Sequence, residues 1–209
     1  MFDKDTGFRA ESKEDKIVGN FEPDNKAILL DTETTGLTGR DELIEISLLL
    51  VQFDRRGRLE IVDEYAGLRE PEVSINPQAH RVHNIDFEQV KGEKLDRKKI
   101  KKLLNRTDFL VAHNASFDRR FVCNEIELFR QKRWLCSMRG INWGKFGCSS
   151  RGLENLLHFH GIKISQSHRA AMDTRALLRL LNCRPEGIST YFLRLLKNSG
   201  IEPEKFEYN

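Results

Sequence analysis

The stretch that decides the fold is AILLDTETTG, residues 27–36. Its first four residues are apolar, and the run ends in two carboxylates, Asp31 and Glu33, before a glycine turn. Such a short apolar run is typical of a strand that is buried on both faces. Because side chains alternate along a strand, Asp31 and Glu33 point to the same face, a few ångströms apart. Two like charges so close are costly unless one is protonated or a cation lies between them, whereas acids that simply meet solvent or cap the next turn need neither.

Two further strands follow directly, over 42–54 and 58–68, with a hairpin at Gly57 between them. The pattern then changes to helical turns over 76–90, a lysine-rich helix over 97–104, a strand over 107–114 and a helix over 116–131. A short strand over 134–137, a helix capped by Ser149–Ser150 that ends at Phe159, and a core helix over 169–181 complete the pattern. Three antiparallel strands followed by β-α-β units predict an α/β fold with a mixed sheet and helices on both faces.

The chain divides into three parts by composition. Residues 1–26 are dense in charge, show no hydrophobic period and are predicted to form a flexible N-terminal arm. The folded domain is expected over 27–183. Residues 184–209 are predicted to be a C-terminal helical extension, in which 188–198 have amphipathic spacing and Gly200 ends the helix. This helix either packs on its own domain or docks onto a partner protein or a second copy of the chain.

The composition excludes several classes of protein. The 209 residues are 39% hydrophobic and 32% charged, which leaves room for one domain with a real core and argues against a disordered chain. No apolar run approaches the ~18 residues of a membrane helix and no secretory signal opens the sequence, so we expect a cytoplasmic protein without a membrane partner. The four cysteines lack C-x-x-C spacing and are expected to be free thiols. A net charge of +3 does not by itself identify a nucleic-acid binder.

Two further carboxylates fall where a core or a site is expected. Asp173 lies within the apolar stripe of the helix over 169–181, so it needs either a cation or dense hydrogen bonding, with a structural ion pair as the alternative. Asp118 falls in the first turn of a helix, where an acid also favours the helix dipole. That position is equally the carboxyl end of a strand, where the sites of α/β proteins gather. Oxygen donors alone suit Mg²⁺ or Mn²⁺ rather than zinc or copper.

His168 precedes Asp173 by five residues, in a loop just before the helix. An ordinary imidazole pKa near ~6.5 suits a general base. The spacing alone does not distinguish such a base from a surface histidine without a role.

Three motifs resemble a known family. DTETTG at 31–36, HNASFD at 113–118 and HRAAMD at 168–173 resemble, in order and spacing, the three exonuclease motifs of the DEDDh family. That family includes the proofreading epsilon subunit of bacterial replicative DNA polymerase III, with ribonuclease T and oligoribonuclease as relatives, and DTETTG is most similar to the epsilon type. The resemblance covers residues 27–182. It implies an RNase H-like fold with a five-stranded mixed sheet, and 3′→5′ hydrolysis of nucleic acid that releases nucleoside 5′-monophosphates.

The resemblance also implies roles for five residues. Asp31 would bridge two divalent cations, Mg²⁺ or Mn²⁺, and Glu33 and Asp173 would complete the ligand shell of the first. Asp118 would hold the second cation through water, and His168 would deprotonate the attacking water. This is a two-metal clamp on the scissile phosphodiester.

A fourth segment, NPQAHRVHNI at 76–85, resembles the family segment whose histidine and following apolar residue contact the terminal nucleotide. His83 and Ile85 match it, although His83 has the alternative of packing on the sheet as a helix-end histidine. Gln78 and Asn84 depart from it, because Glu and Gly are usual there. The remaining candidate contacts with substrate are Thr34, Gly36 and Leu37, whose backbone would approach the 3′ end, Asn114, which with His113 orients a strand end, and the segment Trp143–Phe146, which would stack on bases.

The predicted function is therefore that of a metal-dependent 3′→5′ exonuclease on DNA with a free 3′ end, in proofreading or repair, with a DNA polymerase subunit as a candidate partner. Trimming of RNA 3′ ends uses the same chemistry, and the motifs do not distinguish the two sugars. A nucleic-acid-binding polymerase subunit without turnover is the third alternative. It is disfavoured because all five catalytic residues are present.

Overall fold

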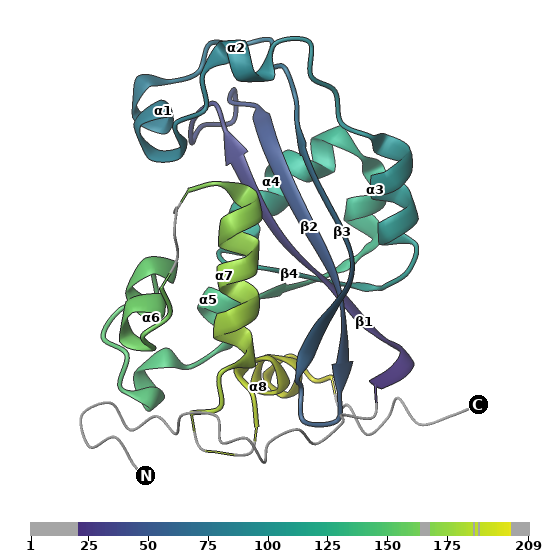
Figure 1. Cartoon of the computed structure of the whole chain (residues 1–209), viewed down its shortest axis with the longest axis vertical. Helices are drawn as coiled ribbons and strands as arrows, with labels where there is room; N and C mark the ends of the chain where they lie inside the picture. Colours follow the sequence, from purple (N-terminus) through teal and green to yellow (C-terminus); the bar gives the residue numbers. More distant parts are fainter. Residues whose placement is uncertain (1–20, 164–167, 186, 188, 202–209) are drawn as a thin grey trace.

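The computed structural model describes residues 21–163, 168–185, 187 and 189–201, with no side-chain description for 21–24. Its centre is a five-stranded sheet in the order β3-β2-β1-β4-β5 (Figure 1). Strands β1 (Phe21–Thr34), β2 (Leu43–Asp54) and β3 (Leu59–Leu68) are antiparallel, whereas β4 (Phe109–Ala112) and β5 (Arg133–Cys136) run parallel to β1. The predicted α/β fold, a mixed sheet of five strands flanked by helices, is confirmed.

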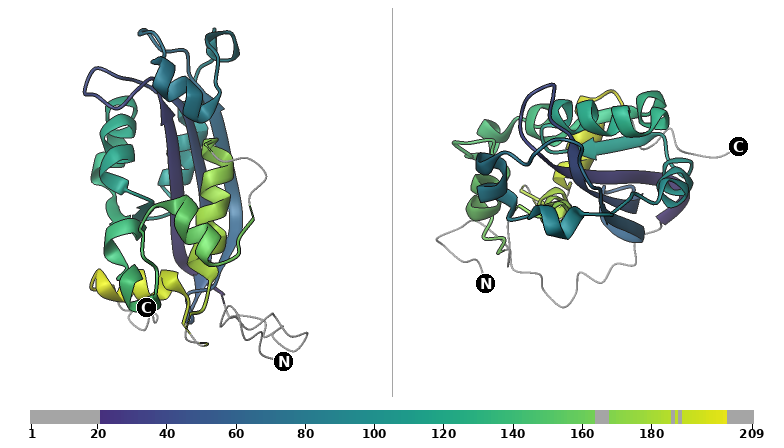
Figure 2. Two further views of the ribbon diagram at one scale, coloured as in Figure 1. Left: turned by 90° about the vertical axis from the view of Figure 1, so that its left-hand side faces the viewer. Right: turned by 90° about the horizontal axis from the view of Figure 1, so that it is seen from above.

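Helices cover both faces of this sheet, which Figure 2 shows edge-on in its left view. On one face lie α6 (Leu153–Phe159), α7 (Ala170–Asn182) and α8 (Tyr191–Asn198). On the other lie α3 (Arg97–Leu104), α4 (Ala115–Glu125) and the short 3-10 helix Glu127–Gln131. The short helices α1 (Pro77–His83) and α2 (Phe87–Val90) lie beyond the end of β1, and α5 (Ser137–Gly140) and the 3-10 helix Trp143–Phe146 follow β5 (Figure 1).

Strand β1 separates two hydrophobic cores, which explains its continuous apolar run. Ala27 and Leu29 pack toward α7 and α8, whereas Ile28 and Leu30 pack toward α3 and α4. Each of these four side chains is fully buried. Beyond Leu30 the same alternation continues into polar residues, so the strand carries its carboxylates to the edge of a packed core.

Several predicted boundaries were wrong. β1 begins at Phe21 rather than Ala27, so the last six residues of the predicted arm belong to the strand, while residues 1–20 lie outside the described part. The helix expected over 116–131 breaks at Ile126, whose backbone is extended and whose side chain is buried. Helix α6 begins after Gly152 without a side-chain cap. Ser150 instead accepts hydrogen bonds from the backbone N–H of Gly152 and the side chain of Asn155.

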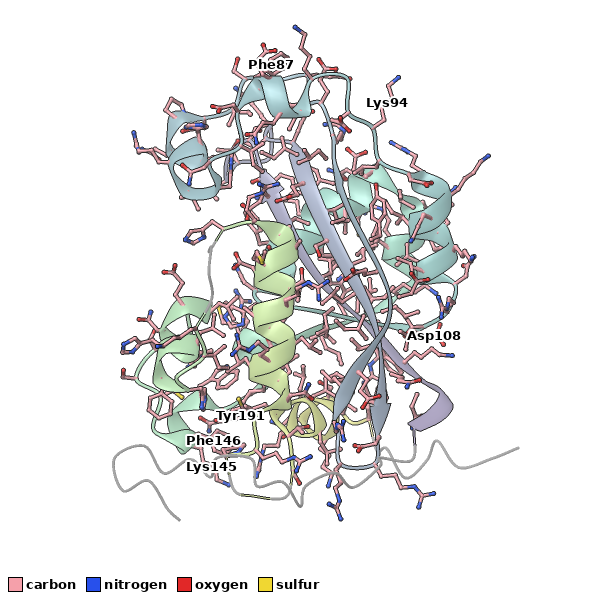
Figure 3. The ribbon with its side chains drawn as sticks, in the orientation of Figure 1. Phe87, Lys94, Asp108, Lys145, Phe146 and Tyr191 are labelled. Atoms are coloured by element: carbon pink, nitrogen blue, oxygen red, sulfur yellow. The ribbon has the colours of Figure 1, made fainter. Side chains whose placement is uncertain are left out.

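The C-terminal helix packs on its own domain. Helix α8 begins at Tyr191, where Thr190 accepts a hydrogen bond from the Leu193 backbone N–H at 3.1 Å, and Gly200 follows it with a positive φ of 70°. The side chains of Tyr191 and Phe192 are buried in the core under α7. Trp143 packs against Tyr191 there with ring centroids 4.6 Å apart, so the prediction that Trp143 stacks on bases was wrong. Phe146 also faces Tyr191 (Figure 3).

The four cysteines are free, as expected from their spacing. In the part of the chain that the structure describes, no helix has the length and apolar character needed to cross a membrane.

Candidate active site

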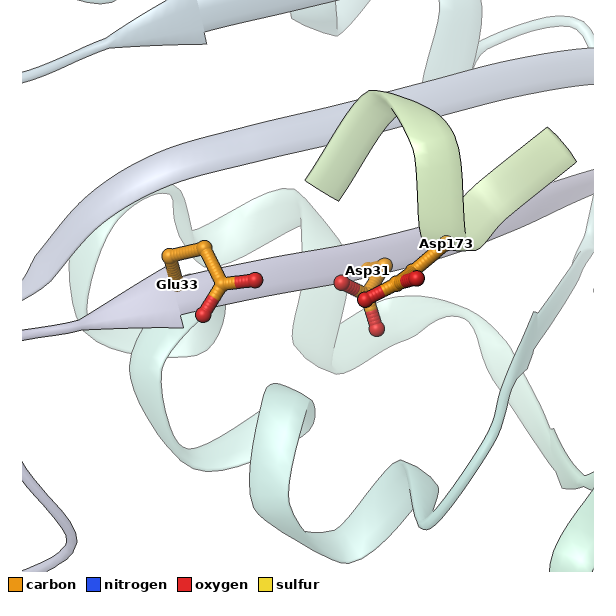
Figure 4. A group of neighbouring side chains, drawn as sticks. All are labelled: Asp31, Glu33 and Asp173. Atoms are coloured by element: carbon orange, nitrogen blue, oxygen red, sulfur yellow. The ribbon is translucent and has the colours of Figure 1, made fainter. Parts of the chain in front are cut away.

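Three of the predicted carboxylates converge at the end of β1. Asp31 and Glu33 project from the same face of this strand, and Asp173 projects from the first turn of α7, which crosses that face (Figure 4). One carboxylate oxygen from each lies within 4.8 Å of the others. All three side chains are partly exposed. Asp31 and Glu33 share one face of β1, and Asp173 lies in the stripe of α7 that packs on this face. The fold therefore brings together Glu33 and Asp173, which lie 140 residues apart in the sequence.

Helix α7 delivers Asp173 because of its apolar stripe. Ala170 and Leu177 are buried, three residues before and four residues after Asp173. Residues at these spacings share one face of a helix, so packing that face on the sheet directs Asp173 at β1. The hydrogen bond that the structure shows at Asp173 is local, because its oxygen Oδ2 accepts the backbone N–H of His168 at 3.0 Å.

Asp118 approaches β1 from the other side of the sheet. It lies in the first turn of α4, is only 2% exposed, and accepts a hydrogen bond from the Thr32 hydroxyl at 2.9 Å. Thr32 alternates with Asp31 and Glu33 and therefore points to the opposite face. Asp118 stands outside the tight group of three, yet its charge is close enough to raise the pKa of Asp31. The preceding Asn114 turns the chain into α4 with a left-handed backbone, φ 68°.

The pKa values of these carboxyl groups are all raised. Burial, followed by the charges of Asp118 and Glu33, raises the pKa of Asp31 well above its ordinary value. Burial and then the charge of Asp173 raise the pKa of Glu33 to about 8, and burial raises that of Asp118 to about 7 against the opposing hydrogen bond from Thr32. The pKa of Asp173 is raised as well, chiefly by burial. The folded chain thus brings together carboxyl groups whose ionised forms it does not stabilise, and a divalent cation bound among them would stabilise those forms.

The donor set fits a hard divalent cation. Four carboxylates supply oxygen donors only, and the described residues around them place neither a cysteine nor a histidine in the group of three. Oxygen donors of this kind bind Mg²⁺ or Mn²⁺ and leave some coordination positions to water or substrate.

His168 stands at the entrance to α7. Its backbone adopts φ 61°, which is uncommon for a residue other than glycine, and its N–H is bonded to Asp173 as described above. The imidazole Nε2 lies 3.2 Å from Glu154 Oε1 of α6, and the side chain is 38% exposed. The histidine is therefore tied to the carboxylate cluster through its backbone, while its ring remains accessible.

Three residues that the sequence analysis did not select surround this cluster. Glu45 of β2 lies opposite Glu33 in the β1–β2 register and is bonded to Arg169, and Glu154 contacts His168. The one signal for Glu45 was an acid inside the apolar run of β2. The signal for Arg169 and Glu154 was absent, because both belong to polar stretches in which charged residues are ordinary.

The loop after β1 carries the next predicted contacts. Thr34 is buried, and its hydroxyl donates to the Gly36 carbonyl at 2.7 Å. A Cβ on Gly36 would lie 2.5 Å from Asp41 Oδ1, so a side chain at this position would have to displace the Asp41 carboxylate. Leu37 is 76% exposed, and its carbonyl accepts a hydrogen bond from Arg120 at 2.9 Å. Of these three residues, Leu37 is the one with an exposed side chain, and its contact with a substrate stays a prediction.

His83 and Ile85 occupy the interior instead. Ile85 is fully buried with Ile44 and Val90, so its position does not support the predicted contact with a terminal nucleotide. His83 is 2% exposed, and its Nδ1 accepts the Ile85 backbone N–H at 3.0 Å. His83 is thus buried at the end of α1, in keeping with the alternative of a helix-end histidine, and its contact with a terminal nucleotide stays a prediction.

His113 holds the strand end that precedes Asp118. Its Nε2 lies 2.8 Å from the Arg151 carbonyl and its Nδ1 lies 2.9 Å from the Ser137 hydroxyl. Because a carbonyl only accepts, Nε2 carries the proton and Nδ1 accepts from Ser137. Burial lowers the pKa of His113, in keeping with this neutral form. His113 thus links the strand end before Asp118 to the segments that contain Ser137 and Arg151, which supports its predicted orienting role.

Comparison with known proteins agrees with this arrangement. The exonuclease family model, RNase_T, matches residues 28–181, which is most of the described chain. The chain belongs to the RNase T exonuclease family. Its fold is the RNase H-like fold of solved exonucleases. As a member of this exonuclease family, the chain is a nuclease, which is a class of hydrolase.

Sequence relatives of this chain include DNA polymerase III proteins. A PolC-type DNA polymerase III from Thermotoga petrophila is 25% identical over 189 residues, which cover 83% of this chain and 12% of that protein. The DNA polymerase III subunit epsilon of Treponema pallidum is 28% identical over 163 residues, 72% of each chain. The chain thus spans a small part of the PolC-type polymerases that it matches.

Solved structures share the fold. Exonuclease X in complex with 5′-overhanging duplex DNA superposes with a TM-score of 0.56 and 24% identity, covering 85% of this chain and 95% of that one. A 3′-exonuclease bound to a histone mRNA stem-loop gives a TM-score of 0.59 and 16% identity, covering 88% and 66%. At these identities the likeness establishes the fold alone.

Proposed function

We propose that this exonuclease is a metal-dependent enzyme that hydrolyses DNA from a free 3′ end and releases nucleoside 5′-monophosphates, in proofreading or repair. The observation that supports it most strongly is the convergence of Asp31, Glu33 and Asp173 within 4.8 Å at raised pKa values. DNA is the proposed substrate because the relatives named above are DNA polymerase III proteins. A polymerase subunit is the corresponding candidate partner.

The four carboxylates would together bind two cations, Mg²⁺ or Mn²⁺. Asp31 would bridge the two, and Glu33 and Asp173 would complete the ligands of the first. Asp118, which stands apart from the group of three and is bonded to Thr32, would hold the second through water. When bound, such ions neutralise charge on the phosphodiester and lower the pKa of the attacking water.

His168 would accept the proton of that water. Two observations support this role: the backbone N–H of His168 is bonded to Asp173, and its side chain is 38% exposed. Replacing His168 by alanine is expected to lower the rate by ~10²-fold or more, the usual contribution of a general base. Mn²⁺ binding should stay within about 3-fold of the unmodified protein, because the imidazole is not one of the proposed ligands.

Single-turnover digestion of matched DNA and RNA oligonucleotides, labelled at the 5′ end, tests the proposal. With Mg²⁺ or Mn²⁺ we expect a ladder that shortens from the 3′ end on DNA, and no products in EDTA. Faster digestion of RNA would favour 3′-end trimming of RNA instead, and tight DNA binding without any products would favour a silent binding subunit.

Asp31→Ala and Asp173→Ala provide the decisive variants, because both are expected to abolish cleavage. Glu64→Gln is the matched control, since Glu64 of β3 is exposed and pairs with Arg175 on the same helix as Asp173. Near-normal rates in the two aspartate variants would contradict the mechanism.

A further inference from the structure

The helix that carries Asp173 is fixed at its first turn by a residue of β2. Helix α7 has no side-chain cap from its own sequence. Instead, its first backbone N–H, that of Ala170, donates a hydrogen bond to Glu45 Oε2 at 2.9 Å. A carboxylate at a helix N-terminus is stabilised both by this hydrogen bond and by the helix dipole. Glu45 therefore caps α7 from a strand 125 residues away.

The same carboxylate binds the side chain of Arg169. The guanidinium donates from Nη2 to Oε1 at 2.8 Å and from Nε to both oxygens at 3.1 and 3.2 Å. The Glu45 side chain is 6% exposed and that of Arg169 35%. Both oxygens of Glu45 are thus committed to Arg169 and Ala170, which leaves them unavailable as ligands of a cation.

The pair lies directly beside the carboxylate cluster. Glu45 faces Glu33 across the β1–β2 ladder, so the two side chains lie on one face of the sheet as close neighbours. Arg169 is near enough to favour the ionised form of Glu33, while Glu45 disfavours it. The pair as a whole is neutral, so its two charges oppose each other at Glu33.

We infer that Glu45 is a positioning residue of the active site: it holds the first turn of α7, with Asp173 and the preceding His168, against β1, and it keeps the guanidinium of Arg169 from pairing with Glu33. This inference rests on the proposed function. Without Glu45, Arg169 is a cation beside unpaired carboxylates, and it would compete with a divalent ion for Glu33.

Mn²⁺ binding to the metal-free protein, measured by isothermal titration calorimetry, tests this inference without reference to turnover. In Glu45→Gln the Arg169 charge is released, and we expect Mn²⁺ to bind ~10-fold more weakly or worse, as for residues that orient metal ligands. The KM for the oligonucleotide should stay within about 3-fold while kcat falls, since the change concerns the ligands rather than the substrate surface.

The double variant Glu45→Gln with Arg169→Gln distinguishes positioning from a general loss of structure. It removes the released cation, and the glutamine carbonyl can still accept the Ala170 N–H. Its Mn²⁺ affinity should therefore recover to within about 3-fold of the unmodified protein. Glu64→Gln, which disrupts the exposed pair of Glu64 and Arg175 on the same helix, should leave Mn²⁺ binding unchanged.

Two results would overturn the inference: unchanged Mn²⁺ binding in Glu45→Gln, or no recovery in the double variant. Asp31→Asn separates this from a failure of the proposed function. If the unmodified protein does not bind Mn²⁺, or if Asp31→Asn binds it equally well, then the metal site itself is wrong. If Asp31→Asn abolishes binding while Glu45→Gln does not weaken it, only the role of Glu45 is wrong.

Discussion

Two glutamates face each other across β1 and β2, and the fold treats them in opposite ways. Glu45 is nearly buried, yet Arg169 and the Ala170 N–H satisfy both of its oxygens. Glu33 lies beside it, and its pKa is raised to about 8 by burial and by the charge of Asp173. The carboxylate at the start of β2 is thus paired within the protein, while those at the end of β1 are not.

This difference separates a structural carboxylate, Glu45, from a proposed metal ligand, Glu33. A buried carboxylate that the protein pairs with its own cation contributes to the position of α7. A group of carboxylates that the protein leaves unpaired destabilises the fold unless protons or metal ions bind there. The end of β1, with its unpaired carboxylates, is therefore the part of the sheet where we propose that divalent cations bind.

The pH dependence of the metal-free protein is the largest expected effect. The folded protein keeps protons on Glu33, at a pKa of about 8, and on Asp118, at about 7, that the unfolded chain has already released. Stability from these raised pKa values is fully present below the unfolded values and is lost as pH rises through the folded ones. Urea unfolding in EDTA should show a decrease of about 3 kcal/mol between pH 6.5 and 9.

Glu33→Gln is the control for that titration, because it cannot ionise. It should remove about 2 kcal/mol of the decrease, since Glu33 has the higher pKa of the two groups. A flat profile in the unmodified protein would mean that the carboxylates at the end of β1 are paired after all, and the contrast with Glu45 would disappear.

Divalent cations should reverse the instability at the end of β1. Ligand that binds only the folded state adds about 2.7 kcal/mol at a hundred times its dissociation constant. At pH 8 we expect Mn²⁺ to raise the melting temperature of the unmodified protein and to leave that of Asp31→Asn unchanged in differential scanning calorimetry. An equal rise in both proteins would place the ion elsewhere on the surface.

The sequence was sufficient for the elements whose patterns are local. The apolar run before Asp31 predicted a strand buried on both faces, and the position of Asp173 in an apolar stripe predicted that it faces the sheet. Both predictions depend on hydrophobic periodicity within a single element, and this periodicity can be read directly from the sequence. The lysine-rich helix was predicted with the bounds that α3 has, Arg97–Leu104.

Features that depend on distant partners could not be predicted in this way. Glu45 is an isolated acid in an apolar strand, and its partner Arg169 lies 124 residues further on. Ile85 matched a family segment, but the sequence alone does not say whether its side chain is exposed or buried. The packing of α1 and α2 buries it against Ile44. Trp143 was predicted to be a loop residue that contacts bases, whereas in the structure it packs against Tyr191 of α8, which lies 48 residues further on.

The stability of Glu45→Gln measures the paired side of the comparison. Disrupting a buried ion pair leaves one group without its partner and costs 3–5 kcal/mol, which the partial exposure of Arg169 reduces to about 2 kcal/mol. Urea unfolding in EDTA at pH 8 should show this loss, while Glu33→Gln should be at least as stable as the unmodified protein. A loss of equal size in both variants would mean that Glu33 also has a structural partner.

The smallest effect is expected one turn further along α7, at the pair of Arg175 and Glu64. It joins the same helix to the neighbouring strand β3, but the two side chains are 46% and 51% exposed. Solvent screens such a pair, so Glu64→Gln should change the free energy of unfolding by less than ~0.5 kcal/mol in the same urea measurement. If it cost as much as Glu45→Gln, any ion pair between α7 and the sheet would matter equally, and burial beside the carboxylates would not be what distinguishes Glu45.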